Sequence, residues 1–336
     1  MTKQYNTDVA IIGAGPVGLF AIFECGMVGL NCHVIDALEE IGGQCTALYP
    51  EKPIYDIAGL PNVRAGDLIA NLEKQSAPYK PSYHLGQSVD SLTEKDGIFT
   101  LTTSKGTQIQ ARAVIIAGGA GAFGPNRPPI EGLENFEGTS VFYAIRNKEQ
   151  FRDKDVVIAG GGDSALDWTI ALEPIAKSVT IVHRREKFRG APDSVAKLHA
   201  LADAGKITLQ TPYQLKSIAG QSGQVETVTV ADLEGKTVDL NADALLCFFG
   251  LATSLGAISE WGIDIEKKEL RINQETSETS LSGVYAVGDI ATYPHKLKLI
   301  LTGFAECAQA AHSIYDRINP DKPLHFEYST TKGTPK

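Results

Sequence analysis

The chain has 336 residues, 43% of them hydrophobic and 21% charged, and a net charge of −9 at pH 7. This length and apolar fraction are sufficient for a large core and for more than one domain. The acidic balance excludes broad binding to nucleic acids or to anionic membranes, which need a basic surface. Because no apolar run reaches the roughly 20 residues of a membrane-spanning helix, and the first residues lack a signal-peptide layout, we expect a cytoplasmic protein.

A strand, a glycine-rich loop, a helix and a second strand are predicted in residues 8–37. The run DVAIIG is typical of a buried parallel strand, and the loop GAGPVG follows it directly with the spacing G-x-G-x-x-G. At the end of the second strand, Asp36 offers a carboxylate that can accept hydrogen bonds from both hydroxyls of a ribose. The pattern predicts a dinucleotide site. Gly13 allows a tight turn, Gly15 allows the approach of a pyrophosphate, and Gly18 allows close packing of the helix.

The same unit recurs in residues 155–183, where the strand DVVIAG leads into GGGDSA, the G-x-G-x-x-A form of the loop, and then into a helix and the strand SVTIVH. Counted from the first glycine of each loop, the position that holds Asp36 in the first unit holds His183 in the second. The ribose-binding carboxylate is therefore missing. The predicted contacts of this loop with a second nucleotide are Gly160, Gly162, Asp163, Ser164 and Ala165.

Residues 184–189 form a basic cluster in an acidic chain, with four cations against the single Glu186. A guanidinium pairs bidentately with a phosphate, which a carboxylate at this point would repel. We predict that this cluster binds the 2′-phosphate of NADPH; a solvated basic face is the alternative. One unit suited to an unphosphorylated ribose and one suited to NADP together imply FAD and NADPH as cofactors. The predicted phosphate contacts are Arg184 and Arg185, with Arg189 as a third and His183 beside them.

Three further stretches resemble flavoproteins of a known superfamily. GVYAVGDI (283–290) resembles the second FAD motif of flavoprotein disulfide reductases, in which the acid, here Asp289, binds the ribityl chain. Residues 113–129 and 244–254 resemble the two crossings between an FAD and an NADPH domain. The plan is similar to thioredoxin-reductase-like proteins over almost the whole chain. This resemblance implies an α/β fold of two Rossmann-like dinucleotide-binding domains, with a discontinuous FAD domain at 1–120 and 254–336 and an NADPH domain at 121–253.

The cysteines separate this chain from bacterial thioredoxin reductases. Those enzymes carry a redox C-x-x-C pair just before the second glycine loop, but residues 140–162 contain no cysteine. The five cysteines of the chain are scattered and form no C-x-x-C pair. This predicts small buried residues rather than a metal site or a redox dithiol. Reduction of disulfides through a protein dithiol is therefore excluded.

What remains resembles the ferredoxin–NADP⁺ reductases of the thioredoxin-reductase-like type. The stretch 42–61, GGQCTALYPEKPIYDIAGLP, is similar to that group, and 323–336 is similar to its C-terminal extension, which covers the flavin. In the group, an aromatic side chain lies on each face of the isoalloxazine ring; here these are Tyr49 and Tyr328, with Phe326 as the alternative to the second. The further FAD contacts that the resemblance implies are Gln44, Val89, Phe123 and Thr330.

The resemblance implies an electron-transfer enzyme in which NADPH passes a hydride to FAD, and FAD passes single electrons to ferredoxin or flavodoxin. The chemistry is centred on the cofactors, so no catalytic acid, base or nucleophile is predicted. Relatives form homodimers, which we expect here as well. Two alternatives stay open: an NADPH-dependent flavin reductase of another acceptor, such as a low-molecular-weight disulfide or a quinone, and a non-catalytic flavin-binding sensor.

Two local expectations concern the flavin edge and the docking surface. A helix that begins near Thr302 or Gly303 is expected to direct the positive end of its dipole at the flavin. An acidic ferredoxin would need a local basic patch on this acidic chain, although exposed lysines more commonly serve only solvation. The candidate patches are Lys296 with Lys298 and Lys52 with Arg64.

Overall fold

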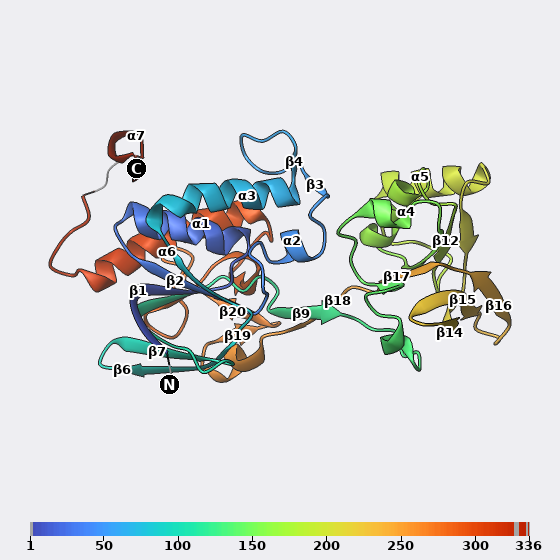
Figure 1. Cartoon of the computed structure of the whole chain (residues 1–336). Coiled ribbons are helices and arrows are strands. Elements are labelled where there is room, and N and C mark those ends of the chain that lie inside the picture. Colours follow the sequence, from blue (N-terminus) through green and yellow to red (C-terminus); the bar gives the residue numbers. More distant parts are fainter. Residues whose placement is uncertain (1–2, 326–328, 334, 336) are drawn as a thin grey trace. The chain divides into compact units, whose positions relative to one another are not determined.

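The computed structural model describes residues 3–325, 329–333 and 335, and it divides into two compact units (Figure 1). Unit 1 is made from two separate stretches, Met1–Phe123 and Thr253–Lys336. Unit 2 is the continuous stretch Gly124–Ala252. The chain therefore leaves unit 1 once and returns to it once.

Unit 1 is built on a seven-stranded sheet with the order β5-β2-β1-β8-β7-β6, in which β21 also pairs with β8. The strands β5, β2, β1, β8 and β21 are parallel, and the hairpin β6–β7 joins β8 in antiparallel register. One edge of β8 has two partners, because β7 pairs with residues 108–111 and β21 with residues 114–116. The bounds are β1 (Gln4–Ile12), β2 (Cys32–Asp36), β5 (Ser82–Leu85), β6 (Val89–Lys95), β7 (Ile98–Thr103), β8 (Gln108–Ile116) and β21 (Val284–Ala286).

The central strand β1 is buried on both faces, as its continuous apolar run predicts. Successive side chains of a strand point to opposite faces. Val9 and Ile11 accordingly belong to the core under the helices, whereas Ala10 belongs to a second core with Phe99 of the hairpin. The three long helices of unit 1 lie together on one side of the sheet (Figure 1). They are α1 (Pro16–Met27), α3 (Ala65–Ser76) and α6 (Ile300–Ile318).

Unit 2 repeats this plan with a parallel five-stranded sheet of order β10-β17-β11-β12-β13. Ile158 of β11 packs with the helices, while Val157 packs with a three-stranded antiparallel sheet of order β14-β15-β16. The bounds are β10 (Val141–Phe142), β11 (Asp155–Gly160), α4 (Asp163–Leu172), β12 (Ser178–Val182), α5 (Pro192–Asp203), β13 (Thr208–Gln210), β14 (Gln214–Gln221), β15 (Gln224–Ala231), β16 (Thr237–Asn241) and β17 (Ala244–Phe248).

Helix α6 begins at Ile300, two residues before the earlier of the two predicted starts. Gly303 is an interior helix position, where a Cβ would lie 2.6 Å from Cγ2 of Val17 and 3.1 Å from Cα of Gly288. This glycine allows close packing of α6 and does not mark its start.

The remaining elements are α2 (Gln44–Ala47), β3 (Pro53–Ile54), β4 (Val63–Arg64), η1 (Ala77–Tyr79), β9 (Ala122–Pro125), η2 (Leu133–Asn135), η3 (Lys148–Phe151), β18 (Leu251–Ser254), η4 (Gly256–Glu260), β19 (Ile265–Glu266), β20 (Glu269–Arg271), η5 (Gly288–Ile290), β22 (Ala291–Thr292) and α7 (Ser329–Lys332).

Candidate functional site

Two of the three glycines in the first loop are required by packing. Gly13 has φ +109°, and a Cβ there would lie 2.3 Å from the carbonyl oxygen of Ala117. A Cβ on Gly18 would lie 1.9 Å from the carbonyl oxygen of Gly13. The first position therefore serves the turn and the third the contact of α1 with that turn, as the sequence pattern predicts.

The middle glycine, Gly15, is different because it faces open space. A Cβ there would meet no described atom within 4 Å. Gly15 has extended backbone (φ −69°, ψ −178°) and is the N-cap residue of α1, and no side chain of the described residues caps that helix. Free N–H groups at a helix N-terminus attract an anion. The loop thus combines unpaired donors with room for a pyrophosphate.

Asp36 ends β2 beside this loop and is held by backbone donors. Its Oδ2 accepts a hydrogen bond from the Ala14 N–H (2.6 Å) and its Oδ1 one from the Leu38 N–H (2.8 Å). Burial raises the pKa of Asp36, and the two N–H donors oppose this by favouring the charged form. Each carboxylate oxygen keeps a lone pair for a ribose hydroxyl. The Gln87 N–H donates to the backbone oxygen of Asp36 (3.0 Å), which brings the segment before the buried Val89 to the same edge.

A second group of predicted residues gathers around Tyr49. Burial raises the pKa of Tyr49 well above its ordinary value, and the charges of Cys45 and Asp289 and a hydrogen bond with Cys45 add to this. The charge of Asp289, the predicted ribityl-binding acid, therefore acts on the predicted ring-stacking tyrosine. Gln44 is half-buried in α2, in the segment that also contains Cys45. Sequence reasoning did not single out Cys45, because a lone buried cysteine carries no motif.

The remaining predicted FAD contacts are less well defined. Phe123 lies in β9. Thr330 is exposed on α7, and within the described part of the chain it has no hydrogen bond to the other predicted FAD residues. Tyr328 and its alternative Phe326 lie outside the described residues. The contacts of these positions with a flavin stay predictions.

The second glycine loop, in unit 2, repeats the geometry of the first. A Cβ on Gly160 would lie 2.7 Å from the carbonyl oxygen of Phe248 and 2.9 Å from Cβ of the buried Ala165. Gly162 is the N-cap of α4 in extended conformation (φ −101°, ψ −178°), without a side-chain cap from any described residue. A Cβ there would again meet none of the described atoms within 4 Å. Gly162 therefore resembles Gly15 in two respects: the space beside it is open, and it lies at a helix N-terminus whose N–H groups have no side-chain cap.

The segment after β12 folds back over this loop. The His183 ring packs on Gly161, where a Cβ would lie 2.2 Å from Cε1, and it stacks on Phe188 with 5.2 Å between ring centroids. The Arg189 N–H donates to the Gly161 carbonyl oxygen (2.7 Å). Asp163 accepts a hydrogen bond from the Ala191 N–H (2.8 Å), and Ser164 is exposed. The structure therefore brings the predicted basic cluster to the glycine loop.

The guanidinium groups of this cluster are free to bind a ligand. Arg184, Arg185 and Arg189 are exposed, and none of them forms an ion pair with a carboxylate of the described residues. Burial lowers the pKa of His183; the backbone contact with Lys187 opposes this, and the three arginine charges add to it. The histidine is therefore a neutral ring that supports the turn, while the arginines supply the positive charge.

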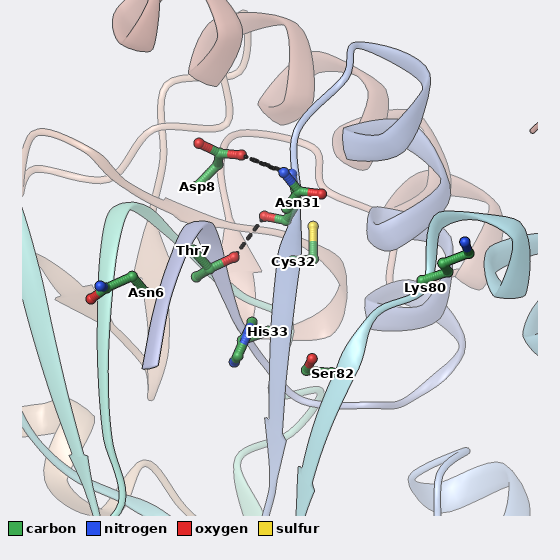
Figure 2. A pocket seen from close by; sticks show the side chains of 8 residues that line it. All are labelled: Asn6, Thr7, Asp8, Asn31, Cys32, His33, Lys80 and Ser82. Carbon is green, nitrogen blue, oxygen red and sulfur yellow. Dashed lines mark hydrogen bonds between the residues drawn. The ribbon is translucent and has the colours of Figure 1, made fainter. Parts of the chain in front are cut away.

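A surface pocket of unit 1 lies away from these loops (Figure 2). It is lined by residues 6–8 of β1 and by the residues at and just before the starts of β2 and β5. There the Thr7 hydroxyl donates to the Asn31 carbonyl oxygen (2.8 Å), and the Asn31 N–H donates to Asp8 (3.0 Å). Cys32 also lines this pocket. Nucleotides bind beyond the carboxyl ends of parallel strands, so this pocket at the opposite ends is not part of either site.

All five cysteines are buried free thiols. Burial raises the pKa of Cys45 to about 11 and that of Cys247 to about 12, from an ordinary value of 9.0. In the part of the chain that the structure describes, no group of three or more metal-binding side chains could hold an ion. The Cys45 and Cys247 thiols are therefore protonated at neutral pH and are poor nucleophiles.

We expect the raised thiol pKa values to make the protein less stable at alkaline pH. The folded state favours the neutral thiols, so their contribution is complete below pH 9 and is lost as the pH rises toward 11–12. Urea unfolding at pH 8 and pH 10.5 should give a lower free energy of unfolding at the higher pH. A Cys247→Ala variant should show a smaller decrease, and an equal decrease in both proteins would contradict the assignment to Cys247.

Comparison with known proteins identifies the family. Residues 7–313 match the family model described as pyridine nucleotide-disulphide oxidoreductase. The chain belongs to this family. As a pyridine nucleotide-disulphide oxidoreductase it has the two predicted cofactors, FAD and NADP(H), and it is an oxidoreductase, as expected from the sequence.

Individual members of the pyridine nucleotide-disulphide oxidoreductase family are similar along the whole chain. The ferredoxin–NADP reductase of Rhodospirillum rubrum is 58% identical over 98% of this chain and 97% of its own length. The enzyme of the same name from Paramagnetospirillum magneticum is 55% identical over 99% of each chain. The predicted resemblance to ferredoxin–NADP⁺ reductases is thereby confirmed.

Solved structures of this pyridine nucleotide-disulphide oxidoreductase fold confirm the predicted fold class. The thioredoxin reductase of Lactococcus lactis has a TM-score of 0.76 at 22% identity and covers 94% of this chain and 99% of its own. The thioredoxin reductase of T. acidophilum has a TM-score of 0.76 at 23% identity and covers 93% of this chain and 98% of its own. At these identities the likeness concerns the fold alone.

Among the described helices, none is both long and apolar enough to cross a membrane.

Proposed function

We propose that this chain passes electrons between NADP(H) and ferredoxin, or flavodoxin, with FAD bound to unit 1 and NADPH bound to unit 2. One observation carries the division of cofactors. The two loops have equivalent open glycines, Gly15 and Gly162, but opposite charges at the end of the following strand. Asp36 suits an unphosphorylated ribose, whereas Arg184 and Arg185 suit a 2′-phosphate.

The residues of unit 1 bind and orient FAD in this proposal. The N-terminus of α1 at Gly15 receives the pyrophosphate, Asp36 the ribose and Asp289 the ribityl chain. Tyr49 lies against the isoalloxazine ring, and the C-terminal extension 323–336 covers the other face. FAD, when bound, supplies the change from two-electron to one-electron transfer. No acid, base or nucleophile of the protein is required.

The acceptor and the assembly are the parts of the proposal that rest on similarity. The relatives named ferredoxin–NADP reductase, 52–58% identical to this chain, support ferredoxin as the partner. A low-molecular-weight disulfide or a quinone as acceptor remains the alternative. We propose a homodimer in the cytoplasm, as expected from the sequence.

A turnover assay on the purified yellow protein tests this function. Cytochrome c reduction is followed with and without added ferredoxin, with NADPH or NADH as the donor, and reduction of the bound flavin is followed separately by stopped flow. We expect strong dependence on ferredoxin and a large preference for NADPH. Fast flavin reduction without ferredoxin dependence would point to another acceptor, and equal rates with NADH would refute the proposed role of Arg184 and Arg185.

A further inference from the structure

A buried ion pair lies next to the second FAD motif. The Lys296 ammonium group pairs with the Glu306 carboxylate, and the two side chains are only 4% and 3% exposed. The expectation that Lys296 forms an exposed basic patch is therefore wrong, because its charge is used inside unit 1. Lys298, two residues later, is 52% exposed and pairs with Glu269 at 2.5 Å. The two lysines thus have different roles.

The Glu306 carboxylate uses both of its oxygens. Its Oε2 accepts a hydrogen bond from the Gly288 N–H (2.7 Å), and its Oε1 accepts one from the Tyr293 hydroxyl (3.0 Å) and also faces Lys296. Burial and the hydrogen bond to Glu306 raise the pKa of Tyr293 to about 12, so its hydroxyl remains a donor. Glu306 therefore links helix α6 to two separate segments of the chain, at Gly288 and at 293–296.

One of these links reaches the cofactor site. Gly288 has φ +77° and directly precedes Asp289. The hydrogen bond from the Gly288 N–H to the Glu306 carboxylate holds this turn. Hydrogen bonds to a charged acceptor are about twice as strong as neutral ones. The same helix packs on the glycine-loop helix, where the Cys307 thiol donates to the Val17 carbonyl oxygen (3.3 Å). The turn that carries Asp289 is thus fixed between α1 and α6.

We propose that Glu306 is a positioning residue for FAD, and that Lys296 is the cation that lets its carboxylate be buried. This inference rests on the proposed role of Asp289 in binding FAD. A buried ion pair adds little stability compared with a well-packed apolar pair, but loss of one partner leaves an uncompensated buried charge. We therefore infer that the Glu306–Lys296 pair serves to position Asp289, and not to stabilise the fold.

Three variants test the pair on the purified holoprotein. They are Glu306→Gln, Lys296→Met and the double variant with both changes, and Lys298→Met is the matched control because it removes an exposed lysine nearby. Release of FAD is measured by flavin fluorescence on dilution, thermal unfolding by circular dichroism, and the flavin midpoint potential by spectroelectrochemistry. None of these measurements uses NADPH or ferredoxin. Failure of the inference is thereby distinguished from failure of the proposed acceptor.

Each single variant should weaken FAD binding at least about tenfold, because one buried charged group loses its partner. Lys296→Met should also lower the flavin midpoint potential, since removal of a nearby cation disfavours added negative charge. The double variant should recover FAD affinity and unfolding temperature, because Gln can still accept from the Gly288 N–H and no ammonium group is left unpaired.

Single variants with unchanged FAD affinity, or losses that simply add in the double variant, would overturn the proposal. If a single variant does not fold, the double variant and its midpoint potential decide the matter: values unlike those of the unmodified protein overturn the inference.

Discussion

Replacing Arg184 and Arg185 together by alanine should raise the KM for NADPH at least about 100-fold while changing the KM for NADH less than about twofold. A hydrogen bond to a charged group contributes about 1.5–3 kcal/mol, so two lost phosphate contacts give at least two factors of ten. Both guanidinium groups are exposed and make no ion pair with the described carboxylates. Their removal should therefore leave the unfolding temperature unchanged.

The control for this change is Arg152→Ala. Arg152 is also an exposed arginine of unit 2, and it pairs with Glu149 of η3 instead of lying at the glycine loop. Steady-state flavin reduction with NADPH and with NADH measures both variants. An equal loss with the two nucleotides, or a loss of the same size in Arg152→Ala, would show that the cluster acts through general charge and not through the 2′-phosphate.

Gly15→Ala should weaken FAD binding by at least about tenfold, or about 1.4 kcal/mol, without unfolding the protein. The backbone at Gly15 is extended, which any residue adopts, and the added Cβ would meet none of the described atoms. The methyl group would instead enter the space that we assign to the pyrophosphate. FAD content after purification and FAD release on dilution measure the loss, and circular dichroism reports on the fold.

Gly18→Ala is the comparison that separates ligand contact from packing. Its Cβ would lie 1.9 Å from a backbone oxygen, that of Gly13, so the helix α1 must shift on the sheet. Overpacking of this kind destabilises a fold by about 1–3 kcal/mol. Gly18→Ala should therefore lower the unfolding temperature, and Gly15→Ala should not. If Gly15→Ala bound FAD as tightly as the unmodified protein, the assignment of this space to the pyrophosphate of FAD would be wrong.

The local patterns of the sequence predicted both loops because their chemistry is contained in short stretches. The spacing of Gly13, Gly15 and Gly18 specifies a turn, an opening and a helix contact, and the structure has these features at those positions. Counting along each unit leads to Asp36 in the first and to His183, directly before Arg184, in the second. Such features depend on neighbours within about 30 residues, so one sequence is sufficient to find them.

Contacts between distant segments could not be predicted in the same way. Lys296 was interpreted as exposed because lysines are almost never buried unless they are paired, and its partner Glu306 lies on a helix with no motif that marks it. The approach of Cys45 to Tyr49 and Asp289 likewise depends on the packing of α2 in unit 1. The start of α6 was expected near Thr302 or Gly303, whereas the helix begins at Ile300 and Gly303 serves the contact with Gly288.

The interrupted course of unit 1 has a consequence for synthesis on the ribosome. Unit 2 is one continuous stretch, so it is complete as soon as Ala252 has emerged, and domains generally fold as units from the N-terminus. Unit 1 must wait, because β21 pairs with the edge of β8 only after residues 284–286 are made, and α6 comes later still. Until then β8 and the face of α1 that receives α6 are exposed in the growing chain. The unit whose synthesis begins first is therefore the last to be completed.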